Sequence, residues 1–149
     1  MSQKILSFDL GTKTGWAYVD NLSEGWDIKS GHFSCDNYIH WRNEVEQLLL
    51  NHSPDIIVCS QTNSFGHYNS SRKMFMLLGI ACLSAEKFSM PLVEFNDSSA
   101  RKAVFGNGKL KKVEAQELLV KRFPLFKENT EDQNDAIILA VGWDILNRE

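Results

Sequence analysis

Cysteine is scarce in this chain, and the few cysteines present form no recognisable framework. Three occur in 149 residues: Cys35, Cys59 and Cys82. Their odd number, wide spacing and lack of a C-x-x-C pair argue against both a disulfide framework and a zinc site. We therefore expect reduced thiols, most of them buried.

Long apolar runs and linker-like segments are also missing. No stretch approaches the ~20 apolar residues that cross a bilayer, and the N-terminus lacks the layout of a signal peptide. Only three prolines are present, and neither a repeat nor a Pro/Gly-rich segment divides the chain. With 43% hydrophobic and 23% charged residues, the composition predicts one globular domain over residues 1–149, cytoplasmic and without a membrane partner.

The charge is mildly acidic overall but unevenly distributed. A net charge of −3 by itself argues weakly against a protein that coats nucleic acid. Between residues 98 and 113, however, the chain has five basic residues and no acidic one: Arg101, Lys102, Lys109, Lys111 and Lys112. A local basic patch is therefore expected on an otherwise acidic molecule.

Short apolar runs followed by amphipathic stretches predict an α/β fold. Three successive strands at 4–9, 15–19 and 26–35, joined by short turns, indicate an antiparallel meander. Later strands at 56–59 and 92–95 alternate with helices at 38–51 and 72–88, so these strands should add in parallel. Further helices are expected from the cap Asn96-Asp97-Ser98-Ser99 to Val104, at 110–122 and at 131–146. The sequence predicts a mixed five-stranded sheet with helices on both faces.

Three aspartates are the strongest candidates for chemistry. Asp9 ends a buried strand just before a glycine turn, where it either faces the mouth of the sheet or bonds local amides. Asp132 and Asp135 share one face of the last predicted helix. They either interact favourably with the helix dipole or form a buried like-charge pair, which requires a cation or altered protonation. Magnesium would meet that requirement, because it prefers hard oxygen ligands.

Two further segments are candidates for nucleic-acid contact. The basic segment contains Gly106-Asn107-Gly108, and exposed amides at the following helix start would favour an anion. The loop near residues 61–72 contains Phe65, Tyr68 and Arg72, and aromatic residues in such a loop either stack on unpaired bases or fold back into the core. A solvated surface is the alternative for the basic segment.

Together these motifs resemble the RuvC-type Holliday junction resolvases of the RNase H-like superfamily. The resemblance covers nearly the whole chain and rests on four motifs in order. These are Ile5-Leu6-Ser7-Phe8-Asp9-Leu10-Gly11-Thr12-Lys13-Thr14-Gly15, Pro54-Asp55-Ile56-Ile57-Val58-Cys59, Gly106-Asn107-Gly108-Lys109 with Lys112, and Asp132-Gln133-Asn134-Asp135-Ala136. The D-x-G-T turn also occurs in sugar kinases and actin-like ATPases, but those folds are much longer.

The resemblance implies a magnesium-dependent endonuclease that nicks four-way DNA junctions symmetrically. Asp9, Asp132 and Asp135 would hold two Mg²⁺ ions, with Mn²⁺ as a substitute, for phosphodiester hydrolysis. The basic residues of the 98–113 segment and Arg72 would contact DNA, and Phe65 and Tyr68 would wedge at the junction centre. A homodimer is expected for a two-fold symmetric substrate. The apolar stripe of helix 72–88 is either its interface or part of the monomer core.

One position departs from the family pattern. The second acid, a glutamate, should follow strand 56–59, where this chain has Ser60 and then Gln61. The loss of this carboxylate leaves three explanations: an engineered inactive variant, a natural branch that uses another acid such as Glu94, or a relative that binds junctions without cutting. The alternative functions are therefore a non-cleaving junction-binding protein and a general RNase H-like nuclease for hybrids or flaps.

Overall fold

The computed structural model of this chain describes residues 3–61 and 68–148 and contains one mixed sheet in the order β3-β2-β1-β4-β5. The strands are β1 (Lys4–Asp9), β2 (Lys13–Leu22), β3 (Gly25–Ser34), β4 (Ile56–Ser60) and β5 (Leu92–Phe95). The helices are α1 (Tyr38–His52), α2 (Tyr68–Lys87), α3 (Asp97–Phe105), α4 (Lys112–Arg122), the short 3-10 helix η1 (Pro124–Glu128) and α5 (Glu131–Asn147). The predicted fold class is confirmed.

The central strand β1 joins the two halves of the sheet. It pairs antiparallel with β2, where Asp9 lies opposite Gly15, and parallel with β4, where Phe8 lies opposite Cys59. The outer pairs are β2–β3, antiparallel, and β4–β5, parallel. The meander and the two parallel additions therefore meet at β1, and its C-terminal end lies at the centre of one edge of the sheet.

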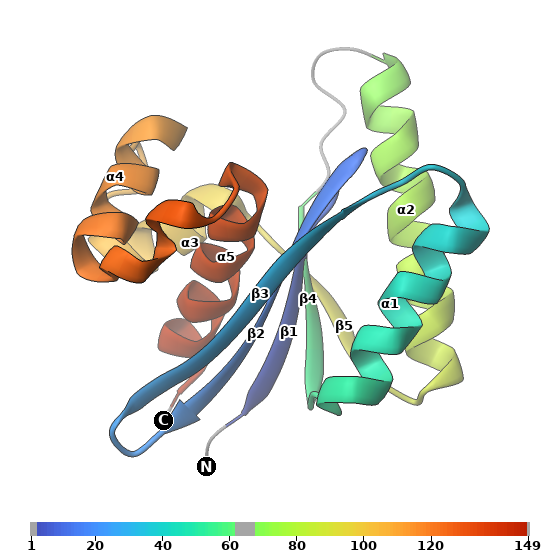
Figure 1. The fold of residues 1–149 in the computed structure, drawn as a ribbon, viewed down its shortest axis with the longest axis horizontal. Helices are drawn as coiled ribbons and strands as arrows, with labels where there is room; N and C mark the ends of the chain where they lie inside the picture. The colour runs from blue at the N-terminus through green and yellow to red at the C-terminus, as the bar shows by residue number, and fades with distance from the viewer. Residues whose placement is uncertain (1–2, 62–67, 149) are drawn as a thin grey trace.

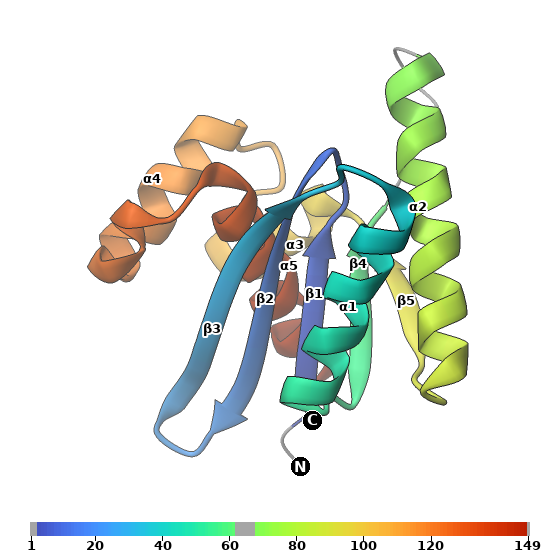
Figure 2. The same cartoon turned by 45° about the vertical axis from the view of Figure 1, so that its right-hand side comes forward.

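Helices cover both faces of the sheet (Figures 1 and 2). Helices α1 and α2 lie on one face, where Leu6, Phe8 and Trp41 are part of a buried cluster. Helix α5 lies on the other face with α3 and α4, and there Ile5, Val19 and Ile137 are part of a second cluster. Successive residues of β1 alternate between these clusters, as the two-residue period of a strand requires. None of the described helices has the length and apolar character to cross a membrane.

Helix α5 packs directly on the backbone of the meander. A Cβ atom at Gly15 would lie 1.9 Å from the carbonyl oxygen of Asp132, so only glycine permits this approach. The Ser7 hydroxyl donates a hydrogen bond of 2.6 Å to the carbonyl oxygen of Ala136, one turn further along α5. These two contacts fix the first turns of α5 against β1 and β2.

Several element boundaries differ from the sequence-based expectations. Strand β2 begins at Lys13 rather than at residue 15, because the turn after Asp9 is only three residues long. Helix α2 begins at Tyr68, four residues earlier than predicted, and η1 was not predicted. Of the cysteines, Cys35 and Cys59 are buried as expected, whereas Cys82 is exposed on α2.

Replacing Gly15 with alanine tests the close packing of α5. The added methyl group overlaps backbone atoms that cannot rotate away, so we expect Gly15→Ala to lower the free energy of unfolding by about 1–3 kcal/mol or more. Urea denaturation measures this change. Gly11→Ala is the matched control, since its Cβ would meet a carbonyl oxygen at 3.3 Å and should cost much less. Equal effects of the two substitutions would contradict the proposed role of Gly15.

Candidate active site

The acidic site is built around Asp9 at the C-terminal end of β1. Ser7 on the same strand faces α5, so strand alternation turns Asp9 toward α5 as well. The following turn is held by Thr14, whose hydroxyl donates to the carbonyl oxygen of Gly11 (2.8 Å) and accepts from the Trp41 indole (3.0 Å). The turn after Asp9 is thus fixed by a side chain of the neighbouring strand β2, which is itself bonded to α1.

Ser60 is the neighbour of Asp9 on β4. The register of β1 and β4 places Ser60 one residue beyond the Phe8–Cys59 pair, and Ser60 shares the α5-facing side of β4 with Ile56 and Val58. It is buried, with 2% of its surface exposed, and its hydroxyl oxygen accepts a hydrogen bond of 3.0 Å from the Leu10 amide. A small hydroxyl that closes the turn therefore occupies the position beside Asp9.

Gln61 forms its hydrogen bonds with the end of the neighbouring strand β5 and with the residue that caps α3. Its backbone amide donates to the carbonyl oxygen of Phe95 (3.0 Å), and its side-chain oxygen accepts from the Asn96 amide group (3.1 Å). Gln61 is exposed. Of the two positions predicted for the missing acid, Ser60 lies on the Asp9 side of the sheet and Gln61 links β4 to the start of α3.

The first turns of α5 carry Asp132 and Asp135. The helix begins with a capping box in which Thr130 and Gln133 exchange hydrogen bonds of 3.1 and 3.2 Å. Because the Asp132 backbone packs on Gly15, which pairs with Asp9, the helix start lies beside the end of β1. The side chain of Asp135 is 11% exposed. The fold thus brings together the three predicted acids from opposite ends of the chain.

Lys112 is the cation of this site. Its ammonium nitrogen lies 2.9 Å from the Oδ2 atom of Asp135 and 3.2 Å from the Oε1 atom of Glu131. Gln116, one turn further along α4, donates a hydrogen bond of 2.8 Å to the Oδ1 atom of Asp135. Both oxygens of this carboxylate are therefore engaged by α4. The sequence had assigned Lys112 only to DNA contact and had not pointed to Gln116 or Glu131.

The surroundings of Asp9 disfavour its ionised form and raise its pKa. Burial is the largest cause that raises the pKa of Asp9 from 3.8 to about 8, and the charges of Asp135, Asp97 and Asp132 add to it, while Lys112 lowers it. The pKa of Asp135 is also raised, first by burial and also by Asp97, although its bond to Lys112 lowers it. A cation at this site would favour the ionised form of both groups.

Asp97 belongs to the same electrostatic group, and the sequence pattern did not reveal it. It is the first residue of α3, and the pattern gave it only a place in a helix cap. Partial burial raises the pKa of Asp97, whereas Arg101 and Lys112 lower it. In the sequence, this role was indicated only by the place of the acid, two residues after the end of β5, the strand that neighbours β4.

The donor chemistry of the site fits a divalent cation, although the side chains do not converge on one point. Carboxylate oxygens are the ligands that Mg²⁺ prefers. Burial and neighbouring acids raise the pKa values of Asp9 and Asp135, so a bound cation would stabilise their ionised forms. Among the described residues, no group of three or more His, Cys, Asp or Glu side chains is arranged to hold a metal ion. Lys112 instead neutralises Asp135 in this structure.

The predicted DNA-contacting residues lie on two sides of the acidic site. Lys102, Lys109 and Lys111 are exposed around α3 and the start of α4, and Arg101 is half-buried with its guanidinium 3.4 Å from the Leu110 carbonyl oxygen. On the other side, Arg72 lines a hollow at the N-terminal part of α2, and Tyr68 is 76% exposed. Phe65 lies outside the described residues.

Glu94, suggested as a replacement acid, lies on the opposite side of the sheet from Asp9. It pairs with Cys59 in the β4–β5 register. Burial is the main cause that raises the pKa of Cys59 and of Cys82 on α2, and the charge of Glu94 adds to it at both thiols. The Glu94 side chain therefore faces the α2 layer, away from Asp9.

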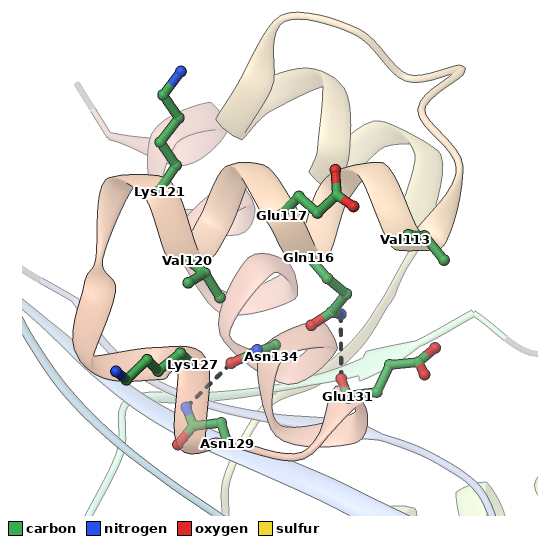
Figure 3. Close-up of a pocket in the computed structure, with 9 residues that line it drawn as sticks. All are labelled: Val113, Gln116, Glu117, Val120, Lys121, Lys127, Asn129, Glu131 and Asn134. Atoms are coloured by element: carbon green, nitrogen blue, oxygen red, sulfur yellow. Dashed lines mark hydrogen bonds between the residues drawn. The ribbon is translucent and has the colours of Figure 1, made fainter.

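A separate hollow of about 640 Å³ lies among α4, η1 and α5 (Figure 3). Its lining mixes apolar groups such as Val120 with charged groups of both signs, including Glu117 and Lys121. Gln116 lines this hollow and also bonds Asp135. The hollow therefore borders the acidic site, and its two visible hydrogen bonds join α4 and the end of η1 to the start of α5 (Figure 3).

Comparison with solved structures identifies the class of protein. The structure of Thermus thermophilus RuvC matches with a TM-score of 0.81 at 17% identity, covering 95% of this chain and 93% of that one. The T. thermophilus RuvC complex with a Holliday junction substrate matches with a TM-score of 0.82 at 14% identity, over 94% and 92% of the two chains. The chain therefore has the fold of RuvC.

Sequence comparison then gives the family. The family model for crossover junction endodeoxyribonuclease RuvC matches residues 11–143, so the chain belongs to the RuvC family of endonucleases. Crossover junction endodeoxyribonuclease RuvC of Protochlamydia amoebophila (strain UWE25) is 29% identical over 149 residues, which cover 92% of this chain and 88% of that relative. The resemblance drawn from the four sequence motifs is confirmed.

The raised pKa of Asp9 predicts a pH-dependent stability. Between its ordinary value of 3.8 and about 8, the folded protein keeps a proton that the unfolded chain releases. The free energy of unfolding should therefore fall as pH rises across this range, by up to ~1.4 kcal/mol per pH unit from this group. Urea denaturation of the metal-free protein at several pH values measures the slope.

Asp9→Asn removes the titrating group and should flatten this slope. Glu24→Gln, in the exposed β2–β3 turn, makes the same change of charge without affecting the site. If Asp9→Asn and Glu24→Gln gave the same slope as the unmodified protein, Asp9 would not carry a raised pKa.

Proposed function

We propose that this chain resolves four-way DNA junctions by hydrolysing phosphodiesters with divalent metal ions, as the resemblance to RuvC resolvases implies. The proposal is supported by the position of Asp9 beside the first turns of α5, the helix that carries Asp132 and Asp135, in a chain of this family. Mg²⁺, with Mn²⁺ as a substitute, is the cofactor that fits the carboxylate donors.

The protein's own groups would act as follows. Asp9, Asp132 and Asp135 would hold the metal, which when bound supplies charge to activate water and stabilise the leaving oxygen. Lys112 would give up its bond to Asp135 on metal binding and turn its charge toward the DNA phosphate. Gln116 would keep Asp135 oriented during that exchange, because its hydrogen bond uses the other carboxylate oxygen.

Basic side chains on both flanks of the site support a DNA substrate. Lys102, Lys109 and Lys111 on one flank and Arg72 on the other would contact phosphates, with the exposed ring of Tyr68 available for stacking on an unpaired base. Binding of this kind releases counterions, so affinity for junctions should fall steeply with salt.

One observation favours a second function, that of a non-cleaving junction-binding protein. Ser60 beside Asp9 removes a carboxylate from the family pattern, and its hydroxyl is already bonded to the Leu10 amide. Binding through the basic flanks does not require that carboxylate. Cleavage assays on defined substrates separate the two functions.

Labelled four-way junctions, duplexes, RNA–DNA hybrids and flaps, each incubated with Mg²⁺, test the proposed activity. We expect paired symmetric nicks in the junction alone. Asp135→Asn should reduce the cleavage rate by on the order of 100-fold or more, because a metal ligand contributes several kcal/mol to the transition state. Junction binding, measured by gel shift, should persist, since the variant keeps every basic residue.

Tight binding of the junction without nicks would favour the binding function. Cleavage of hybrids or flaps instead would favour a general nuclease. Retained cutting by Asp135→Asn would contradict its role as a metal ligand.

We also propose that two copies assemble through the outer face of α2. This face carries Phe75, Met76 and Leu83, which are 47%, 39% and 66% exposed. Gly79 lies between them, and a Cβ atom at this position would have nothing within 4 Å, which leaves room for the close approach of a second helix. A second copy is the expected partner, because two equivalent cuts in a two-fold symmetric junction require two equivalent sites.

Cys82 offers a test of this assembly. It is the one exposed cysteine among the described residues, and it lies on α2 seven residues after Phe75, so both are on the same helical face. A short bis-maleimide should link two chains in high yield, and both Cys82→Ser and Leu83→Glu should abolish the linked product. Sedimentation that shows only monomers at micromolar concentration would contradict the proposed interface.

A further inference from the structure

Where the family pattern has a carboxylate at the end of β4, this chain has Ser60, and an acid, Asp97, follows the neighbouring strand β5. Strand β5 runs parallel to β4, and Ser60 lies opposite Phe95. Asp97 follows two residues later, at the first position of α3. Because parallel strands end at the same edge of a sheet, the start of α3 and the end of β1 that presents Asp9 lie at one edge, with the end of β4 between them.

Hydrogen bonds fix the position of this helix start. The Asn96 side-chain oxygen accepts from the amides of Ser98 and Ser99 at 2.8 and 3.3 Å, and its amide group donates to the Gln61 oxygen at 3.1 Å. The Gln61 backbone amide donates to the Phe95 carbonyl oxygen at 3.0 Å. These bonds join the residue after β4 to the cap of α3, which sets the position of Asp97 relative to the end of β4.

The charge of Asp97 acts on the same groups as the predicted metal ligands. It disfavours ionisation of both Asp9 and Asp135, and its effect on Asp9 exceeds that of Asp132. Lys112, which bonds Asp135, also acts on Asp97. The carboxyl of Asp97 is partly buried, but the residue as a whole keeps an exposed surface, which leaves a path for an ion.

We propose that Asp97 replaces the missing carboxylate of β4 and completes the metal-binding site from the start of α3. The inference rests on the proposed function and deepens it, because it assigns a new ligand to the same centre. Ser60 then serves only to close the turn after Asp9, and the acid comes from the start of α3, two residues after β5 ends. The chain would then be a cleaving branch of the family with a relocated acid.

Binding of Mn²⁺, followed by electron paramagnetic resonance of the free ion, tests the proposal directly. Asp97→Asn should weaken binding by on the order of 10–100-fold, and junction cleavage should fall in parallel. Glu24→Gln, which removes one negative charge at the far turn of the β2–β3 hairpin (Figure 1), should leave both unchanged. Urea denaturation of Asp97→Asn without metal shows that the variant folds, and Asp97→Glu retains the charge if it does not.

A rescue variant separates a ligand from a helix-stabilising acid. Ser60→Glu combined with Asp97→Asn returns a carboxylate to β4 beside Asp9, so Mn²⁺ affinity should recover by about tenfold or more over Asp97→Asn alone. A residue that only stabilises the start of α3 would not be replaced by an acid on another strand. Loss of affinity without rescue would contradict the relocation.

Different results would contradict the role of Asp97 and the proposed metal-dependent function. If the unmodified protein binds Mn²⁺ and cleaves junctions, and Asp97→Asn does so equally well, the role of Asp97 is wrong while the proposed function stands. If the unmodified protein neither binds Mn²⁺ nor cleaves, the proposed metal-dependent function is itself wrong, and the role of Asp97 is wrong with it.

Discussion

The close packing of α5 against the meander is the contact on which the rest of the site depends. Gly15 has no side chain, so the backbone of Asp132 can lie directly on β2 opposite Asp9. Ser7 adds a hydrogen bond to the next turn of the helix. Residues from the first and last parts of the chain thus meet at one edge of the sheet, and small displacements of α5 would separate the acids.

This arrangement gathers negative charge, which the fold must offset. Asp9, Asp97 and Asp135 act on one another, and Lys112 provides a compensating charge through its bonds to Asp135 and Glu131. The net charge of −3 therefore says little about DNA binding, because part of the acid excess lies in a site suited to cations. The basic residues on either side of that site present the opposite charge where a phosphate backbone would run.

Much of the fold could be predicted because its signals are local. Strand periodicity and turn glycines indicated the meander and the two parallel strands, and the motifs around Asp9 and Asp132 indicated their joint role. The early start of α2 and the 3-10 turn after α4 were missed, because tertiary contacts rather than local pattern decide such boundaries. Asp97 was read only as part of a helix cap, since its approach to Asp9 follows from the order of β4 and β5 in the sheet. The bond between Lys112 and Asp135 likewise depends on how α4 and α5 pack.

If carboxylates from β1, α5 and α3 form one metal site, bound Mn²⁺ should lie among them. Anomalous diffraction from crystals soaked in Mn²⁺ would show this, because the scattering locates each ion independently of the protein coordinates. We expect a peak bonded to Asp9 together with Asp132 or Asp135, with Asp97 in the same coordination shell and Lys112 released from Asp135. Absence of Mn²⁺ at saturating concentration, or a peak that contacts none of these carboxylates, would contradict it.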